Sequence, residues 1–297
     1  MATTTICSAS TPPTCPSPLL DHLEATGQLE NTIVVVTSDN GPDSARTSLG
    51  NPIANLLLNG IHLLEGIDTS PENMGLPGSL TAIGPEWASV SASPFSLYQF
   101  YSSEGGLRVP LVIAGPGVAA RGPLDALVHV SDLMPPLLDA AGLAYDAGAL
   151  YGRSILPVLA GKTIETCSAD EVFGGEVSGN ASLYCGNWKL VRTALPRGDF
   201  TWRLFDISVD PGETTDLSLE NPELFAEMRA EYEAYSAETG VPDLGRDEFA
   251  TAQLASNLTE RVIGKYWPYL AGLIVALFAG LNVLFRLARM AVRRPAQ

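Results

Sequence analysis

A carboxylate and an amide stand side by side where a strongly apolar segment ends. Residues 33–41 read Ile-Val-Val-Val-Thr-Ser-Asp-Asn-Gly, which predicts a strand buried on both faces and followed at once by Asp39 and Asn40. Strand ends of an α/β sheet open into its ligand crevice, and carboxylate and amide oxygens suit Ca²⁺ or Mg²⁺. Gly41 permits a sharp exit from the strand. The pattern leaves two interpretations open: a pair of metal ligands, or an ordinary Asp-Asn-Gly turn.

Composition and charge narrow the functional class. The chain has 297 residues, of which 46% are hydrophobic, and a formal net charge of −16. This length is enough for the core of one large domain or two smaller ones. So acidic a composition argues against nucleic-acid binding, for which basic patches supply most of the affinity. The 28 glycines and 22 prolines suit a loop-rich α/β protein.

The predicted elements alternate between helix and strand. Ser17-Pro18 caps a helix that stops at Gly27, and a second short apolar strand covers 111–114. Between the two strands, residues 41–104 read as a long irregular segment, which in a compact domain is usually functional. Further along, the pattern predicts a helix from Ser131 to Gly142, an antiparallel meander over 170–209 and an amphipathic helix over 221–238. Helix followed by strand indicates an α/β layer.

Several segments, in this order and spacing, resemble the sulfatase family. They are TSDNG at 37–41, SSEGGLRVP at 102–110, VSDLMPPLLDAAG at 130–142, GNWKLVR at 186–192 and FDISVDPGETTDL at 205–217. The likeness is greatest to calcium-dependent arylsulfatases, whose DNSxENxG segment corresponds to residues 68–75 and is followed here by GPEWASVSASP at 84–94. The resemblance covers roughly residues 18–240. It implies an α/β fold: an incomplete alkaline-phosphatase-like sandwich, with a mostly parallel sheet and flanking helices, plus a small antiparallel C-terminal subdomain.

The resemblance also implies a chemistry. Sulfatases hydrolyse sulfate esters with a formylglycine nucleophile and a Ca²⁺ ion that polarises the sulfate. Asp39 and Asn40 match one pair of the family's metal ligands. Gln99 stands where relatives of this type have a sulfate-binding lysine; it can donate a hydrogen bond but has no charge. Glu104-Gly105-Gly106 and Arg108 are expected to be structural, with the glycines allowing close backbone approach.

The chain also departs from the family pattern, and two functions therefore stay open. The second aspartate pair, the nucleophilic cysteine and the upstream lysine and histidine residues have no counterpart. Cys7 begins a near match to the formylglycine motif, but Thr11 replaces its arginine, so we assign no catalytic residue. One function is a sulfuric ester hydrolase of arylsulfatase type in truncated form, without the nucleophile and half of the metal site. The alternative is a catalytically inactive, membrane-anchored sulfatase-like remnant or binding protein. A phosphatase or phosphodiesterase of the same superfamily is disfavoured, because the chain has only three histidines.

The C-terminal region predicts a membrane anchor. Residues 266–285 carry no charge. A segment of this length is about long enough to span a bilayer. Four arginines follow the span, so the positive-inside rule puts the domain on the lumenal or extracellular side. N-glycosylation sequons at Asn180 and Asn257 agree with that side. No signal peptide is visible in residues 1–16; either the chain is tail-anchored the other way round or its true beginning is missing.

These patterns give the following organisation and partners. Residues 1–16 are a disordered N-terminus, 17–165 the C-terminal part of a sulfatase catalytic domain and 166–240 its C-terminal subdomain, followed by a linker at 241–262, a transmembrane helix at 263–286 and a basic tail at 287–297. The expected partners are a sulfate-ester small molecule, if an N-terminal half completes the site, and a membrane. Cys167 and Cys185 could form a disulfide or remain two free thiols.

Overall fold

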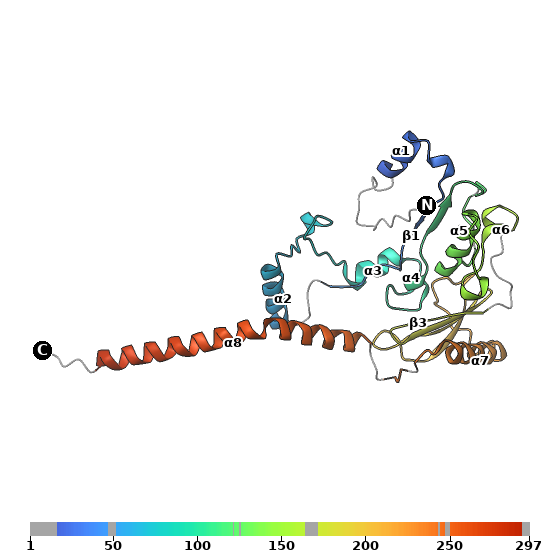
Figure 1. Ribbon diagram of the computed structural model, residues 1–297. Helices are drawn as coiled ribbons and strands as arrows, with labels where there is room; N and C mark the ends of the chain where they lie inside the picture. The colour runs from blue at the N-terminus through green and yellow to red at the C-terminus, as the bar shows by residue number, and fades with distance from the viewer. Residues whose placement is uncertain are drawn as a thin grey trace. The chain divides into compact units, whose positions relative to one another are not determined.

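The computed structural model describes residues 17–46, 52–120, 122–124, 126–163, 172–242, 244–246 and 250–292. Residues 1–16, Cys7 among them, lie outside this range, as does Cys167. The chain divides into two compact units, residues 1–243 and 244–297. The first unit contains two sheets and the helices that cover them (Figure 1).

The first sheet has two strands, β1 (Val34–Thr37) and β2 (Leu111–Ala114). They pair antiparallel, with Val35 opposite Ile113. These two side chains face an apolar hollow that is also lined by residues of α5 (Met134–Ala140) and α6 (Leu156–Leu159). Strand packed on helix is the α/β arrangement that the sequence predicts.

The parallel sheet predicted from the sequence is not what the described strands form. All of their pairings are antiparallel. β1 and β2 run in opposite directions because the chain between them reverses direction instead of making a crossover back to the same end of the sheet. The other face of this sheet is open: Val36 is 41% and Val112 is 59% exposed. The prediction that β1 is buried on both faces is therefore wrong for this structure.

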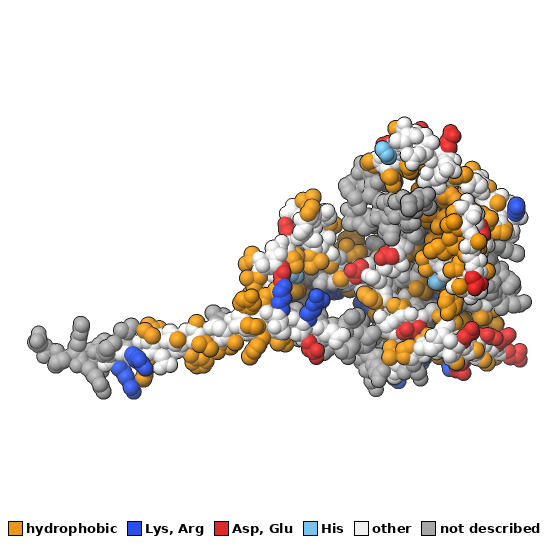
Figure 2. Space-filling model, in the orientation of Figure 1, with side chains coloured by type: hydrophobic (Ala, Val, Ile, Leu, Met, Phe, Trp, Pro, Cys, Tyr) orange, Lys and Arg blue, Asp and Glu red, His pale blue; other side chains and the backbone are white. Residues whose placement is uncertain are grey.

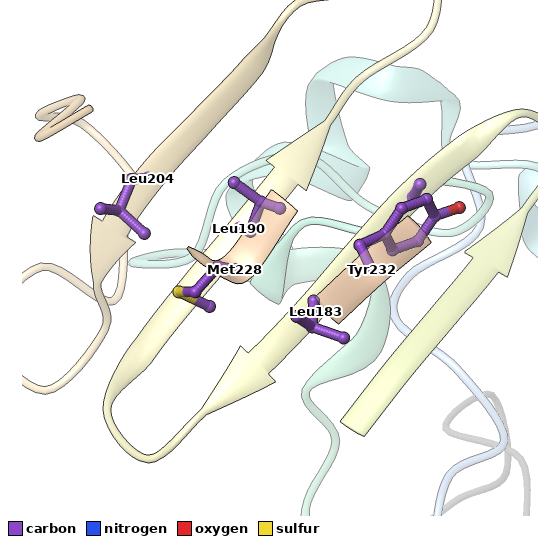
Figure 3. Close-up of a cluster of buried hydrophobic side chains, with 6 residues drawn as sticks. Leu183, Leu190, Leu204, Met228 and Tyr232 are labelled. Carbon is purple, nitrogen blue, oxygen red and sulfur yellow. The ribbon is translucent and has the colours of Figure 1, made fainter. Parts of the chain in front are cut away.

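The second sheet confirms the predicted antiparallel subdomain. Its four strands follow chain order: β3 (Val172–Val177), β4 (Asn180–Cys185), β5 (Trp188–Arg192) and β6 (Trp202–Asp206). Helix α7 (Pro222–Thr239) lies along one face of this sheet. Between them is a buried cluster that includes Leu183, Leu190, Leu204, Met228 and Tyr232 (Figure 3). The outer side of α7 is strongly acidic, as its sequence predicts (Figure 2).

The segment between β1 and β2 is more regular than the sequence indicates. It contains α2 (Pro52–Glu65), α3 (Gly84–Ala92) and the one-turn helix α4 (Glu104–Leu107). Helix α2 escapes prediction because two asparagines and a glycine interrupt its apolar residues. The predicted N-terminal helix is confirmed as α1 (Ser17–Ala25), with Gly27 in the left-handed conformation after it.

The second unit is mainly one long helix, α8 (Ala250–Val292). Within this helix, the stretch Ile263–Arg286 has a mean hydropathy of 2.0 over its apolar part and is long enough to cross a membrane. Length and composition alone support a span here, and a core helix of a soluble protein can pass the same test. The exposed Asn257 lies in the same helix, outside this stretch.

Candidate functional site

The loop after β1 is held together by its own polar groups. The backbone N–H of Asn40 donates to Oδ1 of Asp39 at 3.0 Å, and the Ser38 hydroxyl donates to the Asn40 carbonyl at 3.1 Å. Asp39 is exposed and Asn40 is half-buried. The two residues therefore sit at the strand end that the sequence predicts, on a loop with an ordered backbone and an accessible carboxylate.

This loop packs directly on the backbone of α4. The Gly41 N–H donates to the Gly106 carbonyl at 2.9 Å. A Cβ added at Gly41 would lie 1.9 Å from the Gly105 carbonyl oxygen, and one added at Gly105 would lie 2.2 Å from the Leu97 carbonyl oxygen. Only glycine fits at contacts this short, which confirms the close backbone approach expected for this segment.

Gln99 lies next to the same loop. Its backbone N–H donates to the Pro42 carbonyl at 3.1 Å. Leu97 and Phe100 on either side have φ values of 58° and 75°, so the chain makes a tight, irregular turn around Gln99. The structure thus places the backbone of Gln99 beside the loop that carries Asp39 and Asn40, although 59 positions separate Asn40 from Gln99.

The residues present fit part of a calcium site. A carboxylate and an amide oxygen are the right donors for Ca²⁺, but this ion takes six to eight oxygens. No group of three or more His, Cys, Asp or Glu side chains able to hold a metal occurs among the residues that the structure describes. Asp39 and Asn40 offer the kind of oxygen that Ca²⁺ binds, but too few of them to complete its coordination. Further ligands would be required.

Glu104, the first residue of α4, belongs to a buried ionic cluster. The Lys189 ammonium is 2.8 Å from Glu104 Oε1 and 2.9 Å from Glu213 Oε1. The Tyr184 hydroxyl donates to Glu104 Oε1 at 2.7 Å, and the Glu104 N–H donates to Glu213 Oε2 at 3.2 Å. The Lys189 side chain is 0% exposed, and those of Glu104 and Glu213 are 4% and 3% exposed. These four residues join α4 to the second sheet. We call them the α4 cluster (Tyr184, Glu104, Lys189, Glu213).

Burial and charge act in opposite directions on the α4 cluster. Burial by itself would lower the pKa of Lys189, but its acidic and phenolic neighbours together raise it, so the ammonium stays charged. Burial would raise the pKa of Glu104, yet Lys189 and the Tyr184 hydroxyl lower it overall. For Glu213 burial prevails and raises the pKa. One ammonium thus stabilises mainly the Glu104 carboxylate, which has more donors around it than Glu213 has.

The sequence carries little sign of this cluster. Lys189 alternates with Leu190, which faces α7, so the lysine side chain leaves the opposite face of the sheet. A lysine in an apolar strand is the one local signal. Glu213 falls in the family motif at 205–217, in which Asp210 accepts turn bonds from Thr214 and Thr215. The positive φ of Glu213, 53°, was not foreseeable from that pattern.

In two other polar clusters, around Asp68 and Asp132, the carboxylates accept hydrogen bonds from donors of the protein. Asp68 accepts the Ser70 N–H at 2.8 Å and the Ser70 hydroxyl at 2.6 Å on Oδ1, while the Asn73 amide donates to Oδ2. Asp132 accepts the His129 N–H at 2.9 Å and the Arg153 N–H at 2.8 Å. The Asp68 carboxylate therefore orders a local turn, and that of Asp132 ties the start of its helix to the distant Arg153 segment. Burial lowers the pKa of His129.

A cation that the sequence does not associate with Gln99 approaches its segment. The sequence offers no lysine between Glu65 and Leu107 to replace the missing charge at Gln99. The Arg197 guanidinium, from the connection between β5 and β6, lies 6.0 Å from the centre of the Tyr98 ring. Its sequence distance from Gln99 hides this proximity.

Asn180 does not suit the glycosylation predicted for it. The residue is 3% exposed. Its Nδ2 donates to the Phe100 carbonyl at 2.7 Å, and its Oδ1 accepts the Ala194 N–H at 2.8 Å. A glycan on Nδ2 would have to break a buried hydrogen bond and push apart the sheet and the segment of Gln99, so we expect the folded chain to resist glycosylation at Asn180. The exposed Asn257 keeps its sequon as a prediction.

A family model described as Sulfatase matches residues 17–143. This segment belongs to the sulfatase family. It contains Asp39, Asn40, Gln99 and the whole of α4. Sulfatase relatives extend the match beyond it: an uncharacterised sulfatase of Schizosaccharomyces pombe is 29% identical over 234 residues, which are 75% of this chain and 41% of that protein.

Other sulfatase relatives match shorter stretches. An arylsulfatase of Klebsiella aerogenes is 31% identical over 48% of this chain and 29% of its own length. Arylsulfatase K of Rattus norvegicus is 33% identical over 42% of this chain and 24% of its own length. The chain therefore spans about two fifths of the length of the fission-yeast relative, and less of these two.

Solved structures support the fold. The crystal structure of Ps i-CgsB in complex with k-i-k-neocarrahexaose matches with a TM-score of 0.51 at 21% identity, over 84% of this chain and 45% of that one. A structure linked to glycosaminoglycan metabolism by Bacteroides thetaiotaomicron has a TM-score of 0.52 at 18% identity, over 74% of this chain and 42% of that one. At these identities the likeness establishes an α/β fold and nothing finer.

Proposed function

We propose that this chain forms part of a sulfuric ester hydrolase of arylsulfatase type. The supporting observation is the packing of the Asp39–Gly41 loop on α4, with Gln99 bonded to the same loop through Pro42, inside a segment of the sulfatase family. In this proposal Asp39 and Asn40 are two of the oxygen ligands of Ca²⁺, and Gln99 contacts the sulfate group of a sulfate-ester substrate.

Each residue has a role that its chemistry allows. Bound Ca²⁺ would supply Lewis-acid polarisation of the sulfate. Asp39 and Asn40 hold their oxygens at the end of β1, because the Ser38 and Asn40 hydrogen bonds order the loop. Gln99 can donate a neutral hydrogen bond to a sulfate oxygen. Arg197, beside Tyr98, places a positive charge near this segment.

The rest of the site is proposed to come from sequence that corresponds to the unmatched part of the relatives. The match to the fission-yeast sulfatase takes in 41% of that protein. The open face of the first sheet, with Val36 and Val112 exposed, is suited to cover by a further layer of structure packed on it. Such a portion would supply the nucleophile and the remaining metal ligands.

We also propose that the protein is anchored in a membrane by the helix Ile263–Arg286, with the sulfatase segment on the lumenal or extracellular side. The apolar composition of that stretch supports a span. The four arginines that follow residue 285 support the orientation.

A catalytically inactive sulfatase-like remnant or binding protein is the second candidate. It is favoured by Gln99, because a glutamine in place of a lysine loses a charge-assisted contact to the developing negative charge. Such a loss lowers rates on the order of 10²–10³-fold.

Hydrolysis of an aryl sulfate by the protein as its cells make it distinguishes the two candidates. The comparison is between the unaltered protein, Asp39→Asn and the control Asp43→Asn. The control changes an exposed carboxylate of the same loop, which accepts the nearby Ala45 N–H at 2.8 Å. The proposal expects activity that falls about 10²-fold or more in Asp39→Asn and stays near normal in Asp43→Asn. Absence of hydrolysis by the unaltered protein would favour the remnant, and equal effects of both substitutions would remove Asp39 from the site.

A further inference from the structure

A buried lysine of the second sheet lies directly under the helix that supports the candidate site. Lys189 is 0% exposed in β5, and its ammonium contacts Glu104, the first residue of α4, at 2.8 Å. The proposed chemistry makes no use of this lysine. An ion cluster buried this deeply carries a large desolvation cost, and a well-packed apolar side chain would cost less, so its presence calls for a role other than stability alone.

A short chain of contacts leads from Lys189 to the loop of Asp39 and Asn40. Glu104 begins α4, where the Gly105 N–H donates to the Ser96 carbonyl at 2.8 Å and the Gly106 carbonyl accepts the Gly41 N–H at 2.9 Å. The van der Waals fit at Gly41 leaves no room for a Cβ. Displacement of Glu104 would therefore be transmitted to the Asp39–Gly41 loop by backbone contacts.

The second sheet also holds the other end of the same segment. Asn180 in β4 donates to the Phe100 carbonyl at 2.7 Å and is fixed in turn by the Ala194 N–H at 2.8 Å. Tyr184, which pairs with Lys189 across β4 and β5, donates to Glu104 at 2.7 Å. Side chains of two adjacent strands thus bind residues 100 and 104, and Gln99 immediately precedes residue 100.

We infer that Lys189 is a positioning residue, which sets the place of Glu104 from the second sheet and thereby the spacing between the Asp39–Gly41 loop and Gln99. Its importance for sulfate-ester hydrolysis rests on the proposed function, whereas the positioning itself does not. A charge is required at this place because Glu104 and Glu213 converge on it. Without the ammonium, two carboxylates would face each other in a buried site.

Amide hydrogen exchange of the full chain in detergent tests the inference without substrate or activity. In Lys189→Met, protection factors at Gly41, Gln99 and Gly105 should fall at least tenfold while the amides of β4 facing β5 keep theirs. Lys162→Met, which alters an exposed lysine, is the control for charge and should change nothing. Leu204→Ala, which opens the core on the α7 side of the same sheet, is the control for general destabilisation and should lower protection in the sheet as a whole.

A pH series adds a readout that simple destabilisation would not give. The charged and titratable groups that face Lys189 are Glu104, Glu213 and Tyr184, with Arg108 3.6 Å from the far oxygen of Glu104. In Lys189→Met the two carboxyl groups should take up a proton as the pH falls from 8 to 5, so the lost protection at Gly41 and Gln99 should be partly regained. Leu204→Ala should show no such recovery.

If Lys189→Met does not fold, the double variant Lys189→Met/Glu213→Gln is measured in the same way. In the double variant Glu104 is the one remaining carboxylate of the α4 cluster, and it still accepts the hydrogen bond from the Tyr184 hydroxyl. The same selective fall in protection is expected. Unchanged protection at Gly41 and Gln99 in a folded Lys189 variant, or a pattern identical to that of Leu204→Ala, would overturn the inference. Either result leaves the test of Asp39 in sulfate-ester hydrolysis unaffected.

Discussion

Replacing Gly41 by alanine is a direct test of how the Asp39–Gly41 loop meets α4. The new Cβ would lie 1.9 Å from the Gly105 carbonyl oxygen, 2.9 Å from its carbonyl carbon and 3.0 Å from the Gly106 Cα. All three are backbone atoms, so no side chain can rotate away to make room. Relief of the overlap requires the loop and α4 to separate.

The size of the effect follows from two losses. Forcing an extra methyl group into a packed site costs about 1–3 kcal/mol. Separation also breaks the Gly41–Gly106 hydrogen bond of 2.9 Å, worth about 0.5–1.5 kcal/mol. The backbone at Gly41 lies outside the left-handed region, so alanine adds no conformational strain. We expect the free energy of unfolding to fall by about 2–4 kcal/mol.

Urea denaturation of the full chain in detergent, followed by tryptophan fluorescence, measures this loss. The control is Gly60→Ala in α2, where an added Cβ meets nothing within 4 Å. That substitution should be neutral or stabilising by up to about 1 kcal/mol, because alanine is the better helix former. If Gly41→Ala is as stable as the unaltered chain, the loop does not pack on α4 as described and the geometry of the candidate site is wrong.

Three further predictions concern the second sheet. Tyr184→Phe removes the hydroxyl that donates to Glu104 at 2.7 Å and should lower the free energy of unfolding by about 1–3 kcal/mol in urea; an unchanged midpoint would mean that the buried carboxylate does not need this donor. Burial raises the pKa of Glu213 above its ordinary 4.5, so its contribution to stability is fully present below that value and is lost as the pH rises through the raised pKa. Glu213→Gln should therefore flatten the fall of stability with rising pH, and an unaltered pH slope would contradict the direction of the shift. Because Asn180 is buried, glycosidase treatment of protein from a secretory host should release no glycan from it, and a modified Asn180 found by mass spectrometry would show that the sheet is not packed as described.

The strand end and its neighbours were predictable because their signals are local. A β-branched run ending in Asp39-Asn40-Gly41 predicts β1 and its loop, and alternation predicts the strands around Leu183 and Leu190. The resemblance to the family motifs singles out Gln99 as the counterpart of a sulfate-binding lysine. These features depend on residues that are adjacent in sequence or belong to one motif.

Features that depend on distant contacts were not predictable. The α4 cluster joins Glu104, Lys189 and Glu213, and nothing in the neighbourhood of each residue indicates the others. The sequon at Asn180 is a local pattern that takes no account of burial, which tertiary packing imposes. Strand direction was missed for the same reason: the apolar pattern of β1 and β2 specifies a buried strand, whereas their antiparallel pairing depends on the course of the chain between them.

The size of the protein in its own cells would show whether this chain is part of a larger sulfatase, as we propose. An antibody raised against Pro222–Thr239 would be used on membranes after deglycosylation. We expect a band well above 31.4 kDa, in a membrane fraction that hydrolyses an aryl sulfate. A band at 31.4 kDa without hydrolysis would contradict this proposal and leave Asp39, Asn40 and Gln99 as the trace of an inactive remnant.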